Sequence, residues 1–357
     1  MNKRHLLFLL AVMSATTGMH AQNRNEQNAR QIADEFFRQL DGEQSQASVR
    51  HRNLKTARVE GVGITDTNGG SPAFYIYNRG TDGGFVIVSG DERTSAAVLA
   101  YSDHGSFDAA SMPDNVRGWL DDYASQIAAV RNSAIKGTGV KQLNLPKGNP
   151  IVEPLITTQW NQDAPYNDNT PKMSGAHTPV GCMAVAMAQI MNYHRWPEQG
   201  TGNIEYQWNN SYLDRDFTEC TYDWDNLDVA KLMSDVGIAC KMNYGVNSSS
   251  AYGIDAGRAF VRYFGYDKAM EYHVRHQLDV YDWNDAEWEK MLRDELNARR
   301  PILYTGSKRD GRFYIGHAFV CDGYDDAGYF HFNFGWGGTD DGWYRVTPVE
   351  EDYTDIN

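Results

Sequence analysis

Residues 178–194 read TPVGCMAVAMAQIMNYH, and the part from residue 183 to residue 191 is apolar almost all round. This composition predicts a buried helix, which Pro197 is positioned to end soon after Tyr193. Cys182 then lies at the helix N-terminus, where free backbone N–H groups and the helix dipole stabilise an anion. With a cationic histidine beside it, the pKa of such a thiol falls from about 8.5 to between about 3.5 and 7.5. From this run alone, a reactive thiol and an ordinary core cysteine are equally good interpretations.

Two downstream segments, residues 314–324 and 329–334, predict a β-hairpin closed by the turn-like residues between them. In that hairpin His317 and Asn333 lie on adjacent strands within about one residue pair, with their side chains on one face. A Cys–His–Asn site needs this geometry, because the imidazole takes the thiol proton and the amide oxygen orients the ring. A structural histidine is the alternative interpretation. Gly316 favours the catalytic one, because it leaves no side chain beside the ring.

The first 21 residues have the order of a secretory signal peptide. Lys3 and Arg4 precede the apolar run of residues 6–13, and small and polar residues follow up to Ala21. The run is shorter than the roughly 18 to 20 apolar residues that span a bilayer, so we expect cleavage after Ala21 rather than anchoring. The protein is therefore predicted to be secreted or associated with the cell surface, with no membrane span.

Composition bounds the remaining possibilities. The chain has 357 residues, 41% of them hydrophobic, and this apolar content excludes intrinsic disorder while the length predicts two globular units. The formal net charge of -14 excludes a nucleic-acid partner, because phosphate binding needs a basic surface. The acidic excess falls on residues 151–357, whereas residues 22–150 are nearly neutral. This asymmetry suggests that the two units have separate roles.

Residues 22–145 are predicted to form an α+β unit that ends in a linker at residues 132–150. The linker lacks periodicity and is rich in Gly, Asn, Lys and Pro, so it is also where a protease is expected to cut. The predicted elements are a helix over residues 29–40, strands over 74–77, 84–88 and 96–101, and a helix over 116–130.

Four cysteines remain after export, and three of them have ordinary surroundings. Cys220 and Cys240 either pair or stay free, and Cys321 lies in an apolar run where a buried thiol is usual. The chain has no Cys-x-x-Cys or His-x-x-x-His spacing, which argues against a structural zinc site. We expect the protein to need no metal and no organic cofactor.

Four motifs occur together in this chain: Gly181-Cys182 with the AQIMxYH run that follows, GHAFV at residues 316–320, NxGWGG at 333–338 and WNQxxPYN at 160–167. Together they resemble the streptopain family of secreted bacterial cysteine peptidases, and its interpain-like zymogens in particular. The resemblance covers about residues 22 to 347. It implies an α+β fold in which an α+β prodomain precedes a papain-like catalytic domain with a helical subdomain and an antiparallel sheet subdomain.

The resemblance also assigns roles to residues. It implies that Cys182 is the nucleophile, His317 the base and acid, Asn333 the orienting group, and Gln162 the oxyanion-hole side chain beside the Cys182 N–H. An amide donor in that position contributes about 3 kcal/mol to transition-state stabilisation in a comparable enzyme. Further residues follow with weaker support: Trp336 and Phe334 as the shield of the catalytic pair, and Ser249, Ser250, Ala251 and Gly316 as substrate-binding residues. The family usually has Trp where this chain has Phe334, so we expect the shielding to fall mainly to Trp336.

The expected function is that of a secreted cysteine endopeptidase zymogen, with residues 146–357 as the catalytic domain. The prodomain is expected to inhibit the enzyme until the linker is cut by the enzyme itself, and proteins and peptides, host proteins included, are the expected substrates. Family members continue past the position of Asn357, so the chain is either a fragment or lacks part of the active-site rim. The alternatives are a papain-like amide transferase, a cell-wall peptide hydrolase, and a non-enzymatic surface-binding module in which Cys182 is structural.

Overall fold

The computed structural model describes residues 23–40, 55–57, 71–109, 111–132, 148–277, 281–310 and 313–347. The predicted signal peptide and most of the predicted linker lie outside the described residues. We refer to residues 23–132 as the N-terminal unit and to residues 148–347 as the C-terminal unit. No helix in the described ranges is both long enough and apolar enough to cross a membrane.

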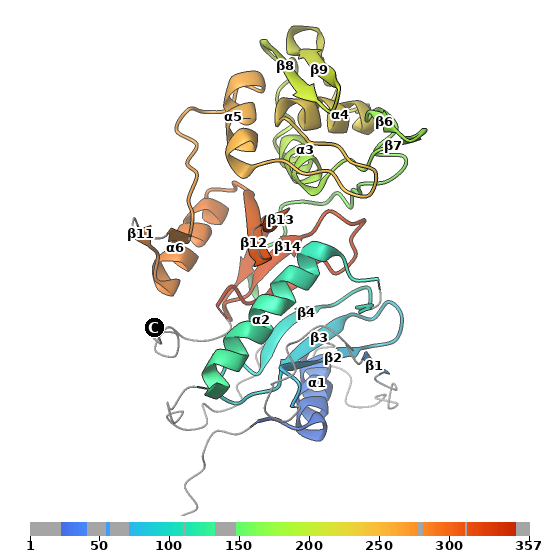
Figure 1. Ribbon diagram of the computed structural model, residues 1–357. Helices are drawn as coiled ribbons and strands as arrows, with labels where there is room; N and C mark the ends of the chain where they lie inside the picture. Colours follow the sequence, from blue (N-terminus) through green and yellow to red (C-terminus); the bar gives the residue numbers. More distant parts are fainter. Residues whose placement is uncertain are drawn as a thin grey trace, which may run out of the picture.

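The N-terminal unit contains the elements that the sequence predicts. Its first helix buries one apolar stripe against the strands, and its second helix crosses the opposite face of the sheet (Figure 1). The bounds are α1 (Glu26–Leu40), β1 (Lys55–Ala57), β2 (Phe74–Asn78), β3 (Phe85–Ser89), β4 (Val98–Ser102) and α2 (Asp114–Asn132).

The C-terminal unit has a helical part and a sheet part. The helical part contains β6 (Lys172–Met173), β7 (Ala176–His177), α3 (Cys182–His194), β8 (Asn203–Trp208), β9 (Ser211–Asp216), the 3₁₀ helix η2 (Phe217–Glu219), α4 (Val229–Ala239) and α5 (Gly253–Tyr263). The sheet part contains β5 (Pro150–Val152), β10 (His276–Gln277), β11 (Tyr281–Asp282), α6 (Asp285–Asn297), β12 (Ile302–Asp310), β13 (Phe313–Asp325), β14 (Phe330–Asn333) and β15 (Gly342–Tyr344).

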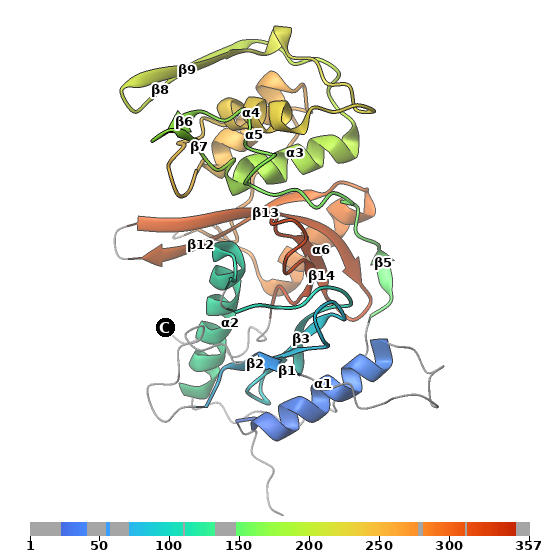
Figure 2. The same ribbon diagram turned by 90° about the vertical axis from the view of Figure 1, so that its right-hand side faces the viewer.

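A single antiparallel sheet runs through both units. Its order is β1-β2-β3-β4-β15-β14-β13-β12, with β5 added along β13. The units join where Tyr101 and Ala100 of β4 pair with Trp343 and Tyr344 of β15. The N-terminal unit thus extends the sheet of the C-terminal unit by strand addition, and Figure 2 shows the two units stacked along this sheet.

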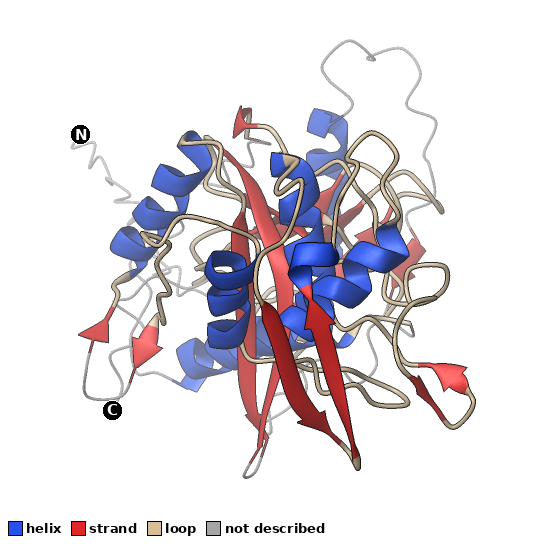
Figure 3. Ribbon diagram, turned by 90° about the horizontal axis from the view of Figure 1, so that it is seen from above, coloured by secondary structure: helices blue, strands red, loops and turns tan. Residues whose placement is uncertain are grey.

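Three hydrophobic cores hold these layers together. The first lies among α3, α4 and α5, the second lies where α2 and α6 cover one face of the shared sheet, and the third lies beneath α1. Seen from above, strands run through the middle of the molecule with helices on both sides (Figure 3). The predicted α+β class, with a helical subdomain, an antiparallel sheet subdomain and a preceding α+β unit, is confirmed.

Candidate active site

Helix α3 begins at Cys182 because Gly181 permits a backbone that other residues resist. Gly181 has φ +91° and precedes the helix without a side-chain cap. A Cβ at this position would lie 2.8 Å from the side chain of Met242 and 3.0 Å from the Ser249 carbonyl oxygen. The absence of a side chain therefore lets the segment with Ser249 approach the helix tip, and the helix is otherwise apolar as predicted.

The Cys182 thiol is partly buried and contacts the strand that carries the candidate base. The Ala318 N–H donates a hydrogen bond to Cys182 Sγ over 3.3 Å. Burial raises the pKa of the Cys182 thiol, and the backbone N–H groups of Ala318, Met183 and Cys182 itself offset only part of that rise. Burial therefore favours the neutral thiol in this state, although its place at a helix tip favours the thiolate in an open cleft.

His317 is brought beside Cys182 through its backbone, but its side chain belongs to the opposite face of β13. Ala318 and Val320 pack in the first core with α3, whereas Phe319 and Cys321 pack in the second core with α2. Because side chains alternate along a strand, His317 shares the face of Phe319 and not the face of Ala318. The sulfur and the imidazole are thus adjacent in the fold but lie on different faces of the strand.

Asn333 lies on the strand next to that of His317, but the expected shared face is not observed: its partner Val320 packs in the first core, on the other face of β13 from His317. The β13–β14 hairpin forms as predicted, and it pairs Asn333 with Val320 rather than with a residue beside His317. The register shift between Cys321 and Gly323 reduces this offset by one residue, because the pairing nearer the turn would otherwise place Asn333 opposite Cys321. A bulge of this kind changes which residues face one another, and the turn residues alone do not predict it.

The side chain of Asn333 forms a ring of hydrogen bonds with Gln189 and Thr158, and it also contacts Gly335. Its Oδ1 accepts hydrogen bonds from Gln189 Nε2 (2.8 Å) and from the Gly335 N–H (3.1 Å). Its Nδ2 donates to the Thr158 carbonyl oxygen (2.9 Å), and the Thr158 hydroxyl donates to Gln189 Oε1 (2.8 Å). Both acceptor positions of the Asn333 oxygen are therefore occupied in this state.

Gln162 lies on the segment that runs alongside the approach to Cys182. Its carbonyl oxygen accepts from the Val180 N–H over 2.9 Å, two residues before the sulfur, and its side chain is buried. This backbone bond keeps the Gln162 segment against the start of α3.

The two aromatic residues after Asn333 differ in their surroundings. The ring of Phe334 is fully buried in the second core, with its centroid 5.2 Å from that of Phe319 and 5.3 Å from that of Tyr344. Trp336 is only partly buried, at the edge of the same core. The ring of Phe334 is therefore part of the second core, and Trp336 is the more accessible of the two rings.

The expected substrate-binding residues differ in exposure. Ser249 is buried, and its hydroxyl donates to the Pro179 carbonyl oxygen over 2.7 Å, just before the helix tip. Ser250 is exposed, and Ala251 is half-buried against the first core. Gly316 is exposed on β13. The segment with Ser249 therefore contacts the residues just before the nucleophile, and Gly316 lies two residues before Ala318, whose N–H reaches Cys182 Sγ.

The second core contains an aromatic anchor from the N-terminal unit. Trp119 of α2 has ring contacts with Phe332 (4.8 Å between centroids), Phe319 (5.8 Å) and Tyr304 (6.0 Å). These three partners come from β14, β13 and β12. Helix α2 therefore packs directly on the strands that carry Asn333 and His317.

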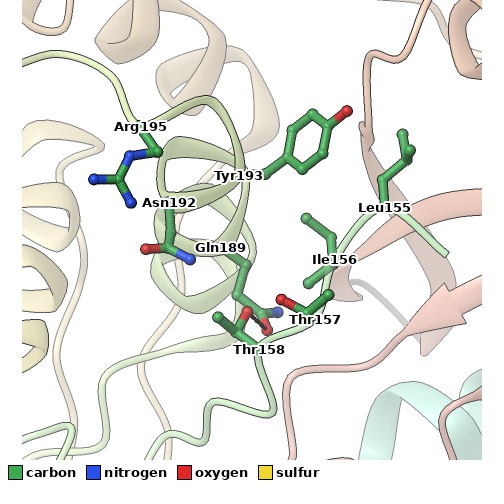
Figure 4. A pocket seen from close by; sticks show the side chains of 8 residues that line it. All are labelled: Leu155, Ile156, Thr157, Thr158, Gln189, Asn192, Tyr193 and Arg195. Atoms are coloured by element: carbon green, nitrogen blue, oxygen red, sulfur yellow. Dashed lines mark hydrogen bonds between the residues drawn. The ribbon is translucent and has the colours of Figure 1, made fainter. Parts of the chain in front are cut away.

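Sequence reasoning missed Gln189 and Thr158, and both line a pocket of about 180 Å³ behind α3 (Figure 4). Figure 4 shows the Gln189 side chain turned toward Thr158, with the hydrogen bond between them drawn. The signal for Gln189 was present, because it is the polar residue within the buried apolar run. A buried amide needs hydrogen-bond partners, so its presence there indicates a specific contact.

This fold, with a thiol at a helix tip against a histidine-bearing strand and an N-terminal unit packed on that strand, is that of a cysteine peptidase zymogen. Family comparison agrees: residues 160–344 match the peptidase C10 family, and residues 21–127 match the Spi protease inhibitor family. The chain belongs to the peptidase C10 family.

Relatives support this assignment along most of the chain. Streptopain of Streptococcus pyogenes is 32% identical over 98% of this chain and 94% of its own length. The thiol protease/hemagglutinin PrtT of Porphyromonas gingivalis is 34% identical over 75% of this chain and 33% of its own length. A mutant fragment of Prevotella intermedia prointerpain A matches in structure with TM-score 0.64 and 28% identity, covering 82% of this chain and 92% of that one. Active interpain A of the same organism matches with TM-score 0.50 and 34% identity, covering 55% and 86%.

Proposed function

We propose that Cys182, His317, Asn333 and Gln162 form the catalytic site of this zymogen once it matures. The observation that carries the proposal is the 3.3 Å contact between Cys182 Sγ and the Ala318 N–H, which puts the strand with His317 against the helix tip. On maturation, a local rearrangement of the chain at His317 would bring the imidazole to the sulfur. The Asn333 amide oxygen then orients the ring.

In the mature enzyme, the Cys182 thiolate attacks the scissile carbonyl carbon of a peptide. Gln162 and the Cys182 N–H bind the oxyanion, and His317 donates its proton to the leaving amine. Water then attacks the acyl-enzyme with His317 as the base, which releases the second product and restores the Cys182 thiolate and the protonated His317. These residues together account for both half-reactions without a metal or an organic cofactor.

Latency follows from the same contacts. While α2 packs on β12–β14, His317 stays on the face of β13 away from the sulfur and burial keeps the thiol protonated. Cutting within residues 132–150 would free the N-terminal unit and let the strand rearrange. The boundary between the prodomain and the catalytic domain is accordingly assigned to this linker, with the enzyme itself as the cutting protease.

Substrates and location belong to the same proposal. Proteins and peptides are the substrates, with host proteins among the candidates for an exported enzyme. The segment Ser249, Ser250 and Ala251 and the opposite residue Gly316 line the cleft that receives them. Trp336 shields the assembled catalytic pair from water. Export follows from the signal-like residues 1–21, with release or retention at the cell surface as the end point.

The test compares the purified wild-type chain with Cys182→Ala and His317→Ala variants on a protein substrate in reducing buffer. The wild type is expected to shorten with time, to gain activity and to yield new N-termini within residues 132–150 by mass spectrometry. Both variants are expected to stay uncut and to lose at least about a thousandfold in activity, as removal of a nucleophile or base does elsewhere. Maturation of the Cys182→Ala chain without any other protease would refute self-processing. An active His317→Ala enzyme would refute the assigned base.

A further inference from the structure

Gln189 is a buried polar residue, and its surroundings indicate a single role for its side-chain amide. It lies two turns along α3 from Cys182, is 1% exposed, and has apolar neighbours along the helix from residue 183 to residue 191. An apolar residue of similar size would fill the same space without the cost of burying an amide. The role of Gln189 must therefore depend on the hydrogen bonds that its amide makes.

Those bonds fix which end of the Asn333 amide faces which way. The Gly335 N–H can only donate, so the Asn333 atom it contacts is the oxygen, and the Thr158 carbonyl can only accept, so the atom it contacts is the Asn333 nitrogen. Gln189 must then present its NH₂ to the Asn333 oxygen and its carbonyl to the Thr158 hydroxyl. Each of these hydrogen-bonding groups therefore has one consistent assignment as donor or acceptor.

The ring lies wholly within the C-terminal unit. Thr158 belongs to the segment before Gln162, Gln189 to α3 and Asn333 to β14, so release of the N-terminal unit removes none of its members. The bond from Gly335 is the longer of the two that reach the Asn333 oxygen, at 3.1 Å against 2.8 Å. Gly335 has φ +74° and packs on Val185, since a Cβ there would lie 2.9 Å from Val185 Cγ1, so its claim on the Asn333 oxygen rests on bond length alone: its bond is the weaker of the two.

We propose that Gln189 is a positioning residue that holds Asn333 with its carbonyl oxygen available to the imidazole of His317. The inference rests on the proposed roles of His317 and Asn333. On maturation the ring N–H of His317 takes the acceptor position that Gly335 holds in the zymogen, while Gln189 keeps the other. Thr158 acts one step further back, because its hydroxyl fixes the orientation of the Gln189 amide.

The first test is a pair of near-isosteric substitutions, Gln189→Met and Thr158→Val, in the full chain processed by immobilised wild-type enzyme. Each is expected to lower kcat roughly 10- to 100-fold, the loss typical of a misplaced catalytic group, with little change in KM. Thr158→Ser keeps the hydroxyl and is expected to recover most of what Thr158→Val loses. Gln207→Met, an exposed Gln on β8, is the matched control and is expected to match the wild type.

A second readout separates positioning from mere support of the fold. The rate of Cys182 alkylation by iodoacetamide follows the thiolate–imidazolium pair, so a badly oriented ring changes its pH profile. Gln189→Met is expected to shift that profile, whereas a purely structural loss lowers the amount of reactive protein at every pH. A shifted profile with an unchanged thermal midpoint supports the inference. An unchanged profile overturns it.

A double variant tests whether Gln189 acts on kcat through Asn333. If Gln189 acts through Asn333, adding Gln189→Met to Asn333→Ala causes no further loss in kcat, and a second full loss overturns the inference. Failure of the proposed function is a separate result, because it means that Cys182→Ala or His317→Ala retains activity. Wild-type kinetics in Gln189→Met, together with an inactive Cys182→Ala, removes Gln189 alone from the mechanism.

Discussion

Asp340 shows how much a single buried carboxyl can contribute to the behaviour of the zymogen. Its side chain is 4% exposed, and neither carboxyl oxygen has a hydrogen-bond partner among the described residues. Burial, then the charges of Asp341 and Asp108, raise the pKa of Asp340 to about 7. Asp108 belongs to the N-terminal unit, so the pKa of Asp340 depends on how the two units pack together.

The raised pKa of Asp340 predicts that the zymogen loses stability as the pH rises from about 4 to about 7. The folded state binds a proton more tightly than the unfolded state, whose pKa is near 3.8, so ionisation in this window favours unfolding. Asp340→Asn removes the charge, and Asn tolerates the φ of +61°. We expect the variant to gain on the order of 2 kcal/mol at pH 8 and little at pH 4.

Urea unfolding at several pH values measures this difference. Asp326→Asn, at an exposed turn where the carboxylate accepts a hydrogen bond from the Asn149 N–H, provides the control with the same substitution. The control is expected to show no gain at pH 8. An equal gain for Asp340→Asn at pH 4 and pH 8 would contradict the assigned cause.

At the residue scale, the sequence singles out candidate reactive groups but not the residues that support them. Cys182 stands out through its place before an apolar run, and His317 through its glycine neighbour and its strand. Gln189 and Thr158 do not stand out in this way, because their role depends on contacts with Asn333 that bring together three separate segments of the chain. A buried amide signals only that some partner exists, and the fold alone identifies it.

At the element scale, local patterns were sufficient to predict the main helices and strands. The predicted segments around α1, α2, α3, β13 and β14 agree with the structure because each has an apolar period or bounding turn residues of its own. The hairpin of β8 and β9 was not predicted, although its turn contains Asn209 with φ +52°. The register between β13 and β14 also escaped prediction, because a bulge depends on the packing of the completed sheet.

At the element scale, Trp119 packs α2 on the C-terminal unit, and its removal tests whether this contact maintains latency. Trp119→Ala deletes a ring that packs on three strands of the C-terminal unit, a loss worth about 3 kcal/mol in a well-packed core. We expect α2 to loosen from the sheet, so that the uncut chain matures faster. The measurement is the rate at which the full-length band disappears, together with iodoacetamide labelling of Cys182.

Ser125→Ala is the control for this experiment, because Ser125 is exposed on another face of α2. It is expected to mature at the wild-type rate. If Trp119→Ala matures no faster than the control while unfolding more easily, the ring stabilises the fold but does not maintain latency.

At the scale of the whole molecule, the main surprise is that the two units share one sheet. Sequence predicted a prodomain and a catalytic domain as separate α+β units, and it gave no indication that β4 would pair with β15. Strand partners more than 200 residues apart in the chain are not determined by local periodicity. The pairing explains how a near-neutral unit attaches to an acidic one, since backbone hydrogen bonds and an aromatic core need no opposite charge.

Gly342 lies where β15 meets β4, and it has no side chain to obstruct that contact, which gives the last prediction. A Cβ on Gly342 would lie 2.6 Å from the Tyr101 carbonyl oxygen and 3.2 Å from the Ser102 Cβ, both on β4. Gly342→Ala therefore forces β4 away from β15, at a cost of about 1 to 3 kcal/mol by analogy with overpacked cores. We expect faster maturation and faster Cys182 labelling in the uncut chain, with unchanged kcat after processing. Gly257→Ala, on α5 with no atom within 4 Å of the added Cβ, is the control and should match the wild type in both measurements. Wild-type latency in Gly342→Ala would mean that the joint between β4 and β15 is dispensable, and that α2 alone keeps His317 away from Cys182.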